Sequence, residues 1–277
     1  MKILSPAKIN LFLHVAGKRS DGYHEIVSLM CCVSLYDILH IDFGNAATSL
    51  TCTDPEIPCN EKNHAVKASN LFLKKFKKNI GVKIHLEKNI PSGAGLGGGS
   101  SNAASVLSAL NSYFGYPFTL EELMATGLEI GADVPFFLFN KPALATGIGE
   151  KLENYALELP YKILIVYPGF SVLTADIYKN LNLRLTNCKK KLKSLSLKQG
   201  FDAQLLCNDL EHVTASMYPE INKVKKAILE QKASGVLMSG SGSSVFGLFT
   251  DGDSAEKAGM VLSLNRGWRV FVVDLLN

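Results

Sequence analysis

The sequence lacks an apolar run of the ~18 residues that a membrane-spanning helix needs. Its longest apolar stretch, residues 26–36, is interrupted by Ser28 and Ser34. It also lacks a strong charge of either sign, because 29 basic and 25 acidic residues leave a net charge of +4. So small an excess does not indicate a nucleic acid or a membrane surface as a partner, and we expect neither. Small anions are the expected ligands.

Cysteine is scarce, and its spacing carries no motif. The six cysteines form no CxxC pair and no dense framework, which argues against a zinc site and against a disulfide scaffold. The N-terminus has only Lys2 before its first apolar pair, and Lys8 interrupts the next apolar run, unlike a secretory or transit segment. These absences together predict a protein of the reducing cytoplasm, and the histidines show no spacing typical of a metal cluster.

Hydrophobic residues make up 47% of the chain and charged residues 19%, which predicts a compact globular fold. Residues 9–15 alternate, with Ile9 and Leu11 on one face and Asn10 on the other, and Lys8 extends the second face. This is the period of a half-buried strand. Further strands are predicted at 34–43, 82–88, 163–167 and 270–275, with a strand–loop–strand at 236–249. Helices are predicted at 65–77, 103–114, 221–228 and 255–264, and Thr119 with Glu122 is a capping-box signature for one more.

This mixture of elements predicts an α+β fold. The pattern loosens around residues 150–160, so we place a domain boundary there, with an N-terminal domain over 1–155 and a C-terminal domain over 156–277. Between residues 177 and 200, seven basic residues occur without an acidic one. A solvated loop is the preferred interpretation of this basic stretch, and a weak role in steering an anionic substrate is the alternative.

Residues 91–102, Pro-Ser-Gly-Ala-Gly-Leu-Gly-Gly-Gly-Ser-Ser-Asn, are the most informative segment of the chain. Five glycines in seven residues let backbone amides approach a ligand closely. Ser100 and Ser101 then open a helix whose unpaired N–H groups and dipole favour phosphate oxygens. A flexible turn needs neither a strand before it nor a long helix and hydroxyls after it. The segment, called the glycine loop below, therefore predicts a polyphosphate site.

Two better-known phosphate loops fit this segment less well. Gly93, Gly95 and Gly98 satisfy GxGxxG, but no carboxylate stands ~20 residues further on to bind a ribose. A Walker A motif fails at Gly99 and Ser100, where Gly-Lys-Ser/Thr is required, and the HRD and DFG motifs of protein kinases are missing from the sequence. An NAD-binding oxidoreductase stays as a weaker alternative.

The glycine loop closely resembles the phosphate loop of the GHMP kinases, the galactokinase, homoserine, mevalonate and phosphomevalonate kinase superfamily. Residues 5–10, Ser-Pro-Ala-Lys-Ile-Asn, resemble the first motif of that superfamily, and residues 238–246, Met-Ser-Gly-Ser-Gly-Ser-Ser-Val-Phe, resemble the third. Asp133, within Gly-Ala-Asp-Val-Pro-Phe at 131–136, matches as well. The resemblance implies a two-domain fold, with an N-terminal domain like ribosomal protein S5 domain 2 and a ferredoxin-like C-terminal domain. It also implies ATP as the phosphoryl donor, with Mg²⁺.

Residues 17–25, Gly-Lys-Arg-Ser-Asp-Gly-Tyr-His-Glu, are similar to one branch of the superfamily, the kinases of 4-diphosphocytidyl-2-C-methyl-D-erythritol. Residues 168–179 and 207–211 support the same branch, whereas Asn102 stands where the branch usually has Asp. The resemblance implies transfer of the γ-phosphate of ATP to the 2-hydroxyl of that sugar alcohol, in the non-mevalonate route to isoprenoids. A GHMP kinase of another small alcohol, or a catalytically silent GHMP-like binding protein, is the alternative.

The resemblance also implies roles for single residues. Asp133 takes the proton of the substrate hydroxyl, while Lys8 keeps Asp133 ionised and contacts the hydroxyl or the transferring phosphate. Asn10 lies two residues along the same strand face as Lys8 and reaches the same site. Cytosine is bound by ring stacking and hydrogen bonds from a group comprising Tyr23, His24 and Tyr178. The ATP phosphates are bound by Pro91, Ser92, Gly93, Ala94, Gly95, Leu96, Gly97, Gly98, Gly99, Ser100 and Ser101. The third motif, with Gly240, Ser241 and Gly242, closes over the substrate.

Each of these roles has a structural alternative. Asp133 is also a good N-cap for a helix opening at 134–135, and the two interpretations are even on the sequence alone. Lys8 is otherwise a solvated lysine at the end of a strand, and the third motif is otherwise a plain hairpin turn. Magnesium is expected to touch Ser100 or Ser101. The same resemblance places Asn63 and Lys67 near the adenine.

Overall fold

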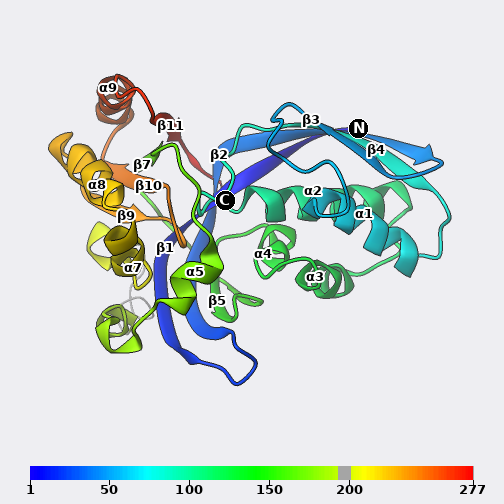
Figure 1. Cartoon of the computed structure of the whole chain (residues 1–277), viewed down its shortest axis with the longest axis horizontal. Helices are drawn as coiled ribbons and strands as arrows, with labels where there is room; N and C mark the ends of the chain where they lie inside the picture. The colour runs from blue at the N-terminus through cyan, green and yellow to red at the C-terminus, as the bar shows by residue number, and fades with distance from the viewer. Residues whose placement is uncertain (193–200, 277) are drawn as a thin grey trace. The chain divides into compact units, whose positions relative to one another are not determined.

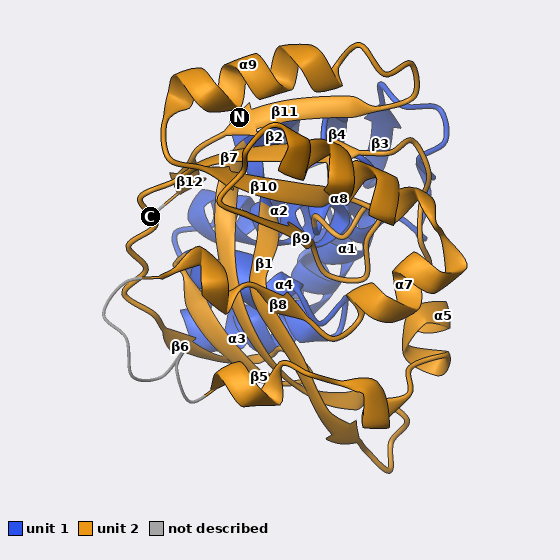
Figure 2. Cartoon of the chain, turned by 90° about the vertical axis from the view of Figure 1, so that its left-hand side faces the viewer, with its two compact units in different colours: residues 1–7, 35–91, 97–140 blue, residues 8–34, 92–96, 141–277 orange. Residues whose placement is uncertain are grey.

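The computed structural model describes residues 1–192 and 201–276. Within it the chain forms two compact units, each built from several segments (Figure 2). Unit 1 comprises residues 1–7, 35–91 and 97–140, and unit 2 comprises 8–34, 92–96 and 141–277. Two long strands, β1 (Lys2–Lys18) and β2 (His24–Asn45), run through both units. The predicted division at residue 155 stays a prediction.

Unit 1 combines strands with four helices (Figure 1). Its further elements are β3 (Ser49–Cys52), α1 (His64–Lys75), β4 (Gly81–Glu87), α2 (Gly98–Tyr113), α3 (Leu120–Leu128) and α4 (Val134–Phe139). Strand β4 pairs antiparallel with β2 and parallel with β3. Opposite residues alternate between the fully buried pair Ile41 and Ile84 and the half-exposed pair His40 and His85, because one face of the sheet packs against the core.

The helices of unit 1 confirm their predicted stripes. Apolar side chains of α2 at Ala103, Val106, Leu107 and Leu110 are buried, as the spacing indicates. Helix α3 begins at the predicted capping box, in which Thr119 Oγ1 accepts a hydrogen bond from Glu122 N and the Glu122 carboxylate accepts one from Thr119 N.

Unit 2 is built around a four-stranded antiparallel sheet in the order β11-β7-β10-β9. Its elements after β2 are β5 (Ala143–Gly147), β6 (Lys151–Asn154), β7 (Lys162–Tyr167), α5 (Thr174–Lys179), the 3-10 turns η1 (Leu183–Leu185) and η2 (Ala203–Leu205), β8 (Cys207–Asn208), α7 (Glu211–Met217), α8 (Glu220–Glu230), β9 (Gly235–Met238), β10 (Val245–Phe249), α9 (Gly252–Leu262), β11 (Arg269–Val273) and β12 (Leu275–Leu276). Strands β9 and β10 form the predicted strand–loop–strand. Helix α8 buries Ile221, Val224 and Ile228 in the core of this unit, together with Leu164 and Val166 of β7.

Strand β1 differs from its prediction, because it is buried on both faces. Ile9 and Leu11 are fully buried, as expected, but Lys8, Asn10 and His14 on the opposite face are only 4%, 2% and 5% exposed. The alternation in the sequence therefore distinguishes a buried apolar face from a polar face that is also buried. It does not mark a face exposed to solvent. Beside β1, strand β8 pairs with it in parallel, with Phe12 opposite Cys207.

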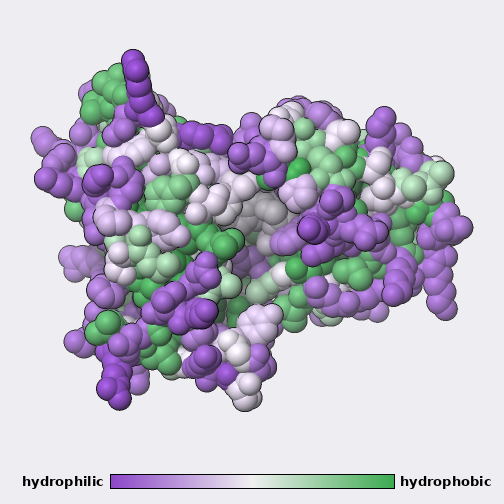
Figure 3. Space-filling model, in the orientation of Figure 1, coloured by the Kyte–Doolittle hydropathy of each residue, from purple (hydrophilic) through white to green (hydrophobic). Residues whose placement is uncertain are grey.

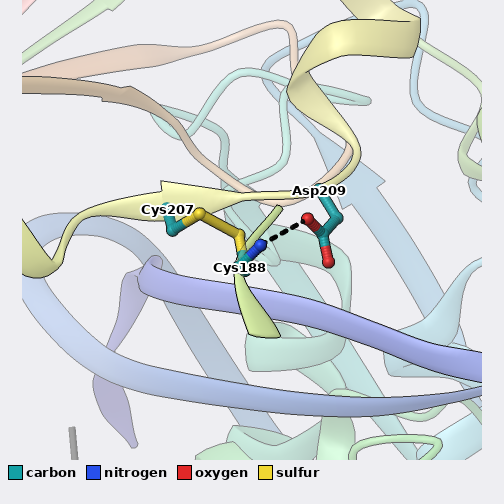
Figure 4. Close-up of side chains that lie close together, drawn as sticks. All are labelled: Cys188, Cys207 and Asp209. Atoms are coloured by element: carbon teal, nitrogen blue, oxygen red, sulfur yellow. Dashed lines mark hydrogen bonds between the residues drawn. A yellow bond between two sulfur atoms is a disulfide. The ribbon is translucent and has the colours of Figure 1, made fainter. Parts of the chain in front are cut away.

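A disulfide joins Cys188 and Cys207, which the sequence did not predict (Figure 4). The two cysteines are 19 residues apart and lack a short-range motif. Next to them, Asp209 accepts hydrogen bonds at Oδ1 from Asn187 N (2.8 Å) and Cys188 N (3.0 Å). Its Oδ2 accepts from His14 Nδ1 (2.6 Å) and from the backbone of β1. One buried carboxylate thus fixes the segment that carries Cys188.

Helix α9 begins three residues earlier than predicted and ends two residues earlier. Asp251 caps it, since its Oδ1 accepts a hydrogen bond from Ser254 N (2.8 Å). Two apolar residues of α9, Met260 and Val261, are 71% and 50% exposed, and Figure 3 shows hydrophobic surface over this helix. Among the described residues, no helix is both long enough and apolar enough to cross a membrane.

Candidate active site

The glycine loop has the backbone that its sequence predicts. Gly93, Gly95 and Gly97 have φ angles of 61°, 75° and 71°, a left-handed conformation that favours glycine. Helix α2 begins directly after Gly97, which as N-cap residue makes no side-chain capping hydrogen bond. The N–H groups of its first turn therefore have no side-chain cap of their own, and they and the helix dipole suit phosphate oxygens.

The third motif packs on part of the glycine loop within unit 2. Ser239 Oγ donates a hydrogen bond to Gly95 O (2.9 Å), and Ser244 N donates to Ala94 O (3.0 Å). A Cβ atom at Gly95 would lie only 2.0 Å from Ser239 O, so the two backbones leave no room for a side chain. The third motif does join strands β9 and β10 as a hairpin turn, and it is also a support for residues 92–96.

Lys8 and Asn10 meet inside unit 2. Lys8 Nζ donates a hydrogen bond to Asn10 Oδ1 (2.6 Å), which confirms that the two residues share a strand face. Lys8 is 4% exposed, so the interpretation as a solvated lysine is wrong. Its backbone N–H donates to Leu96 O (2.9 Å), which attaches the first motif to the glycine loop. Asn10 Nδ2 donates to Ser28 Oγ (2.8 Å), and this bond fixes the orientation of the amide.

Asp133 lies at the N-cap position of α4 but does not act as a cap. Its side chain makes no capping hydrogen bond, and its φ and ψ angles of −82° and −12° are helical. The side chain is half-buried, and α4 is held in place by the buried Val134 and Phe136 that follow. The capping role that the sequence left open is therefore not used.

Two of the three residues that the resemblance assigns to cytosine, His24 and Tyr178, lie together in unit 2. The rings of His24 and Tyr178 stack, with centroids 4.9 Å apart and planes at 26°. Tyr23 is 58% exposed. The pKa of His24 is lowered, first by burial and then by the charge of Lys18, so the neutral imidazole is favoured.

Of the two residues predicted near the adenine, Lys67 is exposed and Asn63 has a structural role. Asn63 Oδ1 accepts a hydrogen bond from Ala65 N (2.9 Å), and its Nδ2 donates to Pro58 O (2.9 Å), so its side chain caps α1. The next residue, His64, was not predicted. Its Nδ1 is buried without a hydrogen-bond partner among the described residues, and a Cβ atom at Gly99 would lie 3.4 Å from it. His64 thus borders the glycine loop.

A buried polar network under the glycine loop was also missed by the sequence analysis. Asp37 accepts hydrogen bonds from Lys88 Nζ (2.8 Å) and Asn102 Nδ2 (3.0 Å) at one oxygen. Asn102 Nδ2 also donates to Ser5 Oγ (3.1 Å), which in turn shares a hydrogen bond with Ser101 Oγ (2.7 Å). An Asp at position 102 would place a second carboxylate against Asp37, which explains physically why this chain has Asn there.

Oxygen donors for magnesium are present in unit 1. Ser101 Oγ is engaged with Ser5, whereas Ser100 Oγ lies 3.8 Å from where a Cβ atom would stand on Gly131, two residues before Asp133. Hydroxyl and carboxylate oxygens are hard donors and fit Mg²⁺ held mainly by phosphates. Cys188, Cys207 and Asp209 also lie close enough together to hold a metal, but the two sulfur atoms are bonded to each other and Asp209 already accepts four hydrogen bonds.

Four of the five described basic residues of the stretch 177–200 are exposed, as a solvated segment requires: Lys179, Arg184, Lys189 and Lys190. Lys191 instead donates to Gln204 O (2.6 Å) and Leu206 O (2.9 Å). Lys193 and Lys198 lie outside the described residues.

Comparison with known proteins gives the same family as these motifs. The sequence matches the GHMP kinases N terminal domain over residues 63–141 and the GHMP kinases C terminal domain over 184–262. It is 45% identical to the 4-diphosphocytidyl-2-C-methyl-D-erythritol kinase of Syntrophotalea carbinolica, over 99% of this chain and 98% of the relative. The chain belongs to the 4-diphosphocytidyl-2-C-methyl-D-erythritol kinase family of GHMP kinases. The kinase of Syntrophus aciditrophicus is 46% identical over the same shares of both chains.

Solved structures place the fold in the same family. A crystal structure of 4-(cytidine 5'-diphospho)-2C-methyl-D-erythritol kinase superposes with a TM-score of 0.82, at 36% identity over the full length of both chains. Homoserine kinase from Cytophaga hutchinsonii has a TM-score of 0.76 at 22% identity, covering 99% of this chain and 94% of that one, and shows the fold alone. The predicted α+β GHMP kinase fold is confirmed.

Proposed function

We propose that this chain transfers the γ-phosphate of ATP to the 2-hydroxyl of 4-diphosphocytidyl-2-C-methyl-D-erythritol, giving the 2-phosphate and ADP. The observation that carries this proposal is the 45% identity, over nearly the whole of both chains, to a kinase named for that substrate. The reaction is a step of isoprenoid precursor synthesis, and the cytoplasm, which supplies ATP, is the proposed compartment.

The proposed reaction forms one phosphorus–oxygen bond and breaks another. Asp133 accepts the proton of the 2-hydroxyl, the oxygen attacks the γ-phosphorus in line, and ADP leaves with the bridging oxygen.

Lys8 is proposed to stabilise the negative charge that gathers on the transferring phosphate. An ammonium group that is 4% exposed acts with little screening by water, so its field is stronger than that of a surface lysine. Asn10 supports this role, because its Oδ1 accepts from Lys8 Nζ and its Nδ2 is held by Ser28, which fixes where the ammonium group lies.

The phosphates of ATP are proposed to bind the backbone N–H groups of residues 93–101. Ser100 would help to hold Mg²⁺ together with the phosphates, and the ion would supply positive charge to the triphosphate. The stacked rings of His24 and Tyr178, with Tyr23, are proposed to recognise cytosine, and the neutral His24 imidazole offers one donor and one acceptor to the base edge.

A coupled ADP-release assay over several acceptor alcohols tests the proposal. ADP release is expected with the cytidyl substrate, and only background release with mevalonate, with homoserine or without an acceptor. The position of transfer is read by ³¹P NMR, because the carbon that carries the 2-hydroxyl also carries the methyl group and has no hydrogen. The new phosphate signal is therefore expected to show no three-bond coupling to a proton.

Three outcomes would contradict the proposal. Faster turnover of mevalonate or homoserine would make the chain a GHMP kinase of another alcohol. Nucleotide binding without ADP release from any acceptor would make it a silent binding protein. Proton coupling of the product phosphate would move the reaction to another hydroxyl.

A further inference from the structure

Residues 208–211, Asn-Asp-Leu-Glu, carry three polar side chains to which phosphoryl transfer gives no role. They join the end of β8 to the start of α7. Asn208 is 8% exposed and Asp209 7%, so their polar atoms need partners inside the protein. Asp209 fixes β1 and the segment of Cys188, as described above. Asn208 and Glu211 turn instead to the third motif.

Both the nitrogen and the oxygen of the Asn208 side-chain amide form hydrogen bonds with backbone groups. Its Nδ2 donates hydrogen bonds to Met238 O (2.8 Å) and to Gly240 O (2.7 Å). Its Oδ1 accepts from Leu210 N (2.9 Å), which fixes the orientation of the amide plane. Glu211 holds the other side of Met238, whose N–H donates to Glu211 Oε2 (2.8 Å). The backbone of Met238, at the end of β9, is thus hydrogen-bonded to these two side chains at both its N–H and its C=O.

The held segment continues directly into the contact with the glycine loop. A Cβ atom at Gly240 would lie 3.2 Å from Gly95 O, and the neighbouring Ser239 Oγ donates to that same carbonyl (2.9 Å). Four residues on, Ser244 N donates to Ala94 O (3.0 Å). A displacement of Gly240 therefore cannot leave residues 94–95 in place, because their backbones pack without intervening side chains.

We propose that Asn208 is a positioning residue for nucleotide binding. Through the carbonyls of Met238 and Gly240 it holds the third motif against residues 92–96, so that the N–H groups of the glycine loop are arranged before ATP arrives. This inference rests on the proposed function, because it takes the glycine loop to bind the ATP phosphates.

Asn208→Asp tests this role with almost no change in size. The substitution replaces a two-proton donor by a carboxylate oxygen facing two carbonyl oxygens, so the third motif has to move away. Asn111 provides a matched control in unit 1. It is 5% exposed, its Nδ2 donates to Phe118 O (3.0 Å) and its Oδ1 accepts from Phe118 N (3.1 Å), and it lies at the opposite end of α2 from Ser100 and Ser101. Asn111→Asp thus makes the same chemical change in a comparable burial.

Steady-state kinetics and thermal unfolding of both variants separate positioning from stability. Both substitutions are expected to lower the unfolding temperature, because each leaves buried carbonyls without a donor. Only N208D is expected to raise KM for ATP, by about tenfold, with a smaller change in KM for the acceptor. N208S keeps one donor and adds no charge, so its KM for ATP is expected to fall between those of the wild type and N208D.

Binding of a non-hydrolysable ATP analogue, measured by calorimetry, gives the same comparison without turnover. Weaker binding by N208D than by the wild type and N111D supports the positioning role. Equal affinity of N208D and the wild type, or equal loss in N208D and N111D, would overturn it. A wild-type protein that binds the analogue but releases no ADP contradicts only the proposed reaction, whereas one that does not bind it contradicts both proposals.

Discussion

At Lys8 the chain buries an ammonium group that most proteins leave in water. It is 4% exposed and donates to Asn10 Oδ1. Burial raises the pKa of the nearby Cys32 thiol to about 12, although Lys8 opposes this shift, so the thiol stays neutral and supplies no negative charge. A lysine kept in this environment supports the role proposed for it beside a transferring phosphate.

Asp133→Asn is expected to lower kcat by ~10²–10⁴-fold, because the amide cannot accept the proton of the substrate hydroxyl. KM for ATP is expected to stay within about twofold of the wild-type value, since the proposed phosphate contacts are made elsewhere. Initial-rate kinetics with varied ATP measure both quantities. Asp253→Asn, an exposed aspartate in the first turn of α9, serves as the control and should turn over normally. Full activity of D133N would remove the assignment of the base.

Tyr23→Ala is expected to raise KM for the cytidyl substrate about tenfold while KM for ATP changes little, because one stacked base contributes ~1–3 kcal/mol. Tyr116→Ala, which removes a tyrosine that is 71% exposed, is the matched control. The measurement is a two-substrate kinetic analysis of both variants. An equal rise in both KM values for Y23A would argue against stacking on the base.

Among the elements, those with a repeated local pattern were predicted well and those without one were missed. The stripe of α2 and the capping box at Thr119 were found because each lies within one turn or a few turns of chain. Strand β8 and the short helix α5 were missed, since two to six residues carry no period. The burial of Asn10 was also missed, because a polar strand face normally indicates solvent, whereas here it faces the interior.

The strand β2 supplies a carboxylate whose removal tests the network under the glycine loop. In Asp37→Asn, the Lys88 side chain, 5% exposed, loses its ion-pair partner, and the free energy of unfolding is expected to fall by ~3–5 kcal/mol. Urea unfolding measures this change. Asp42→Asn, five residues along the same strand and exposed, is the control and should lie within about 0.5 kcal/mol of wild type. A D37N protein as stable as D42N would show that the buried pair contributes nothing.

Across the whole molecule, the pairings missed by the sequence analysis are those between distant positions. His14 and Asp209 are 195 residues apart, and Lys88 and Asp37 are 51 apart. The sequence shows that both residues of such a pair are present, but not that they are close in space. The glycine loop and the first and third motifs are each a continuous segment, so they could be located directly in the sequence. The roles of Lys8 and Asp133 came from the family resemblance, because an isolated lysine or aspartate has no local signal of catalysis.

The disulfide between Cys188 and Cys207 predicts that reduction destabilises the protein. Closing a loop with a sequence separation of 19 residues stabilises a fold by ~3 kcal/mol, so a reductant is expected to lower the unfolding temperature by several degrees. Thiol titration of the denatured, unreduced protein is expected to find the free cysteines Cys31, Cys32, Cys52 and Cys59 alone.

Two double variants isolate this effect. The C188S/C207S protein should no longer respond to reductant, whereas C52S/C59S should respond like the wild type. Titration of all six cysteines in the unreduced protein would contradict the bond.

Because β1 is buried on both faces, the number of residues in the strand is as tightly constrained as their identity. Phe12 is in register with Cys207, and successive positions along the strand face opposite ways. Deleting one residue between Lys8 and Phe12 would rotate the ammonium group into the apolar interior and bring an aliphatic chain to its place. A single-residue deletion or insertion there would therefore move Lys8 out of the place proposed for it beside the transferring phosphate, whereas a substitution at a neighbouring position would leave it there.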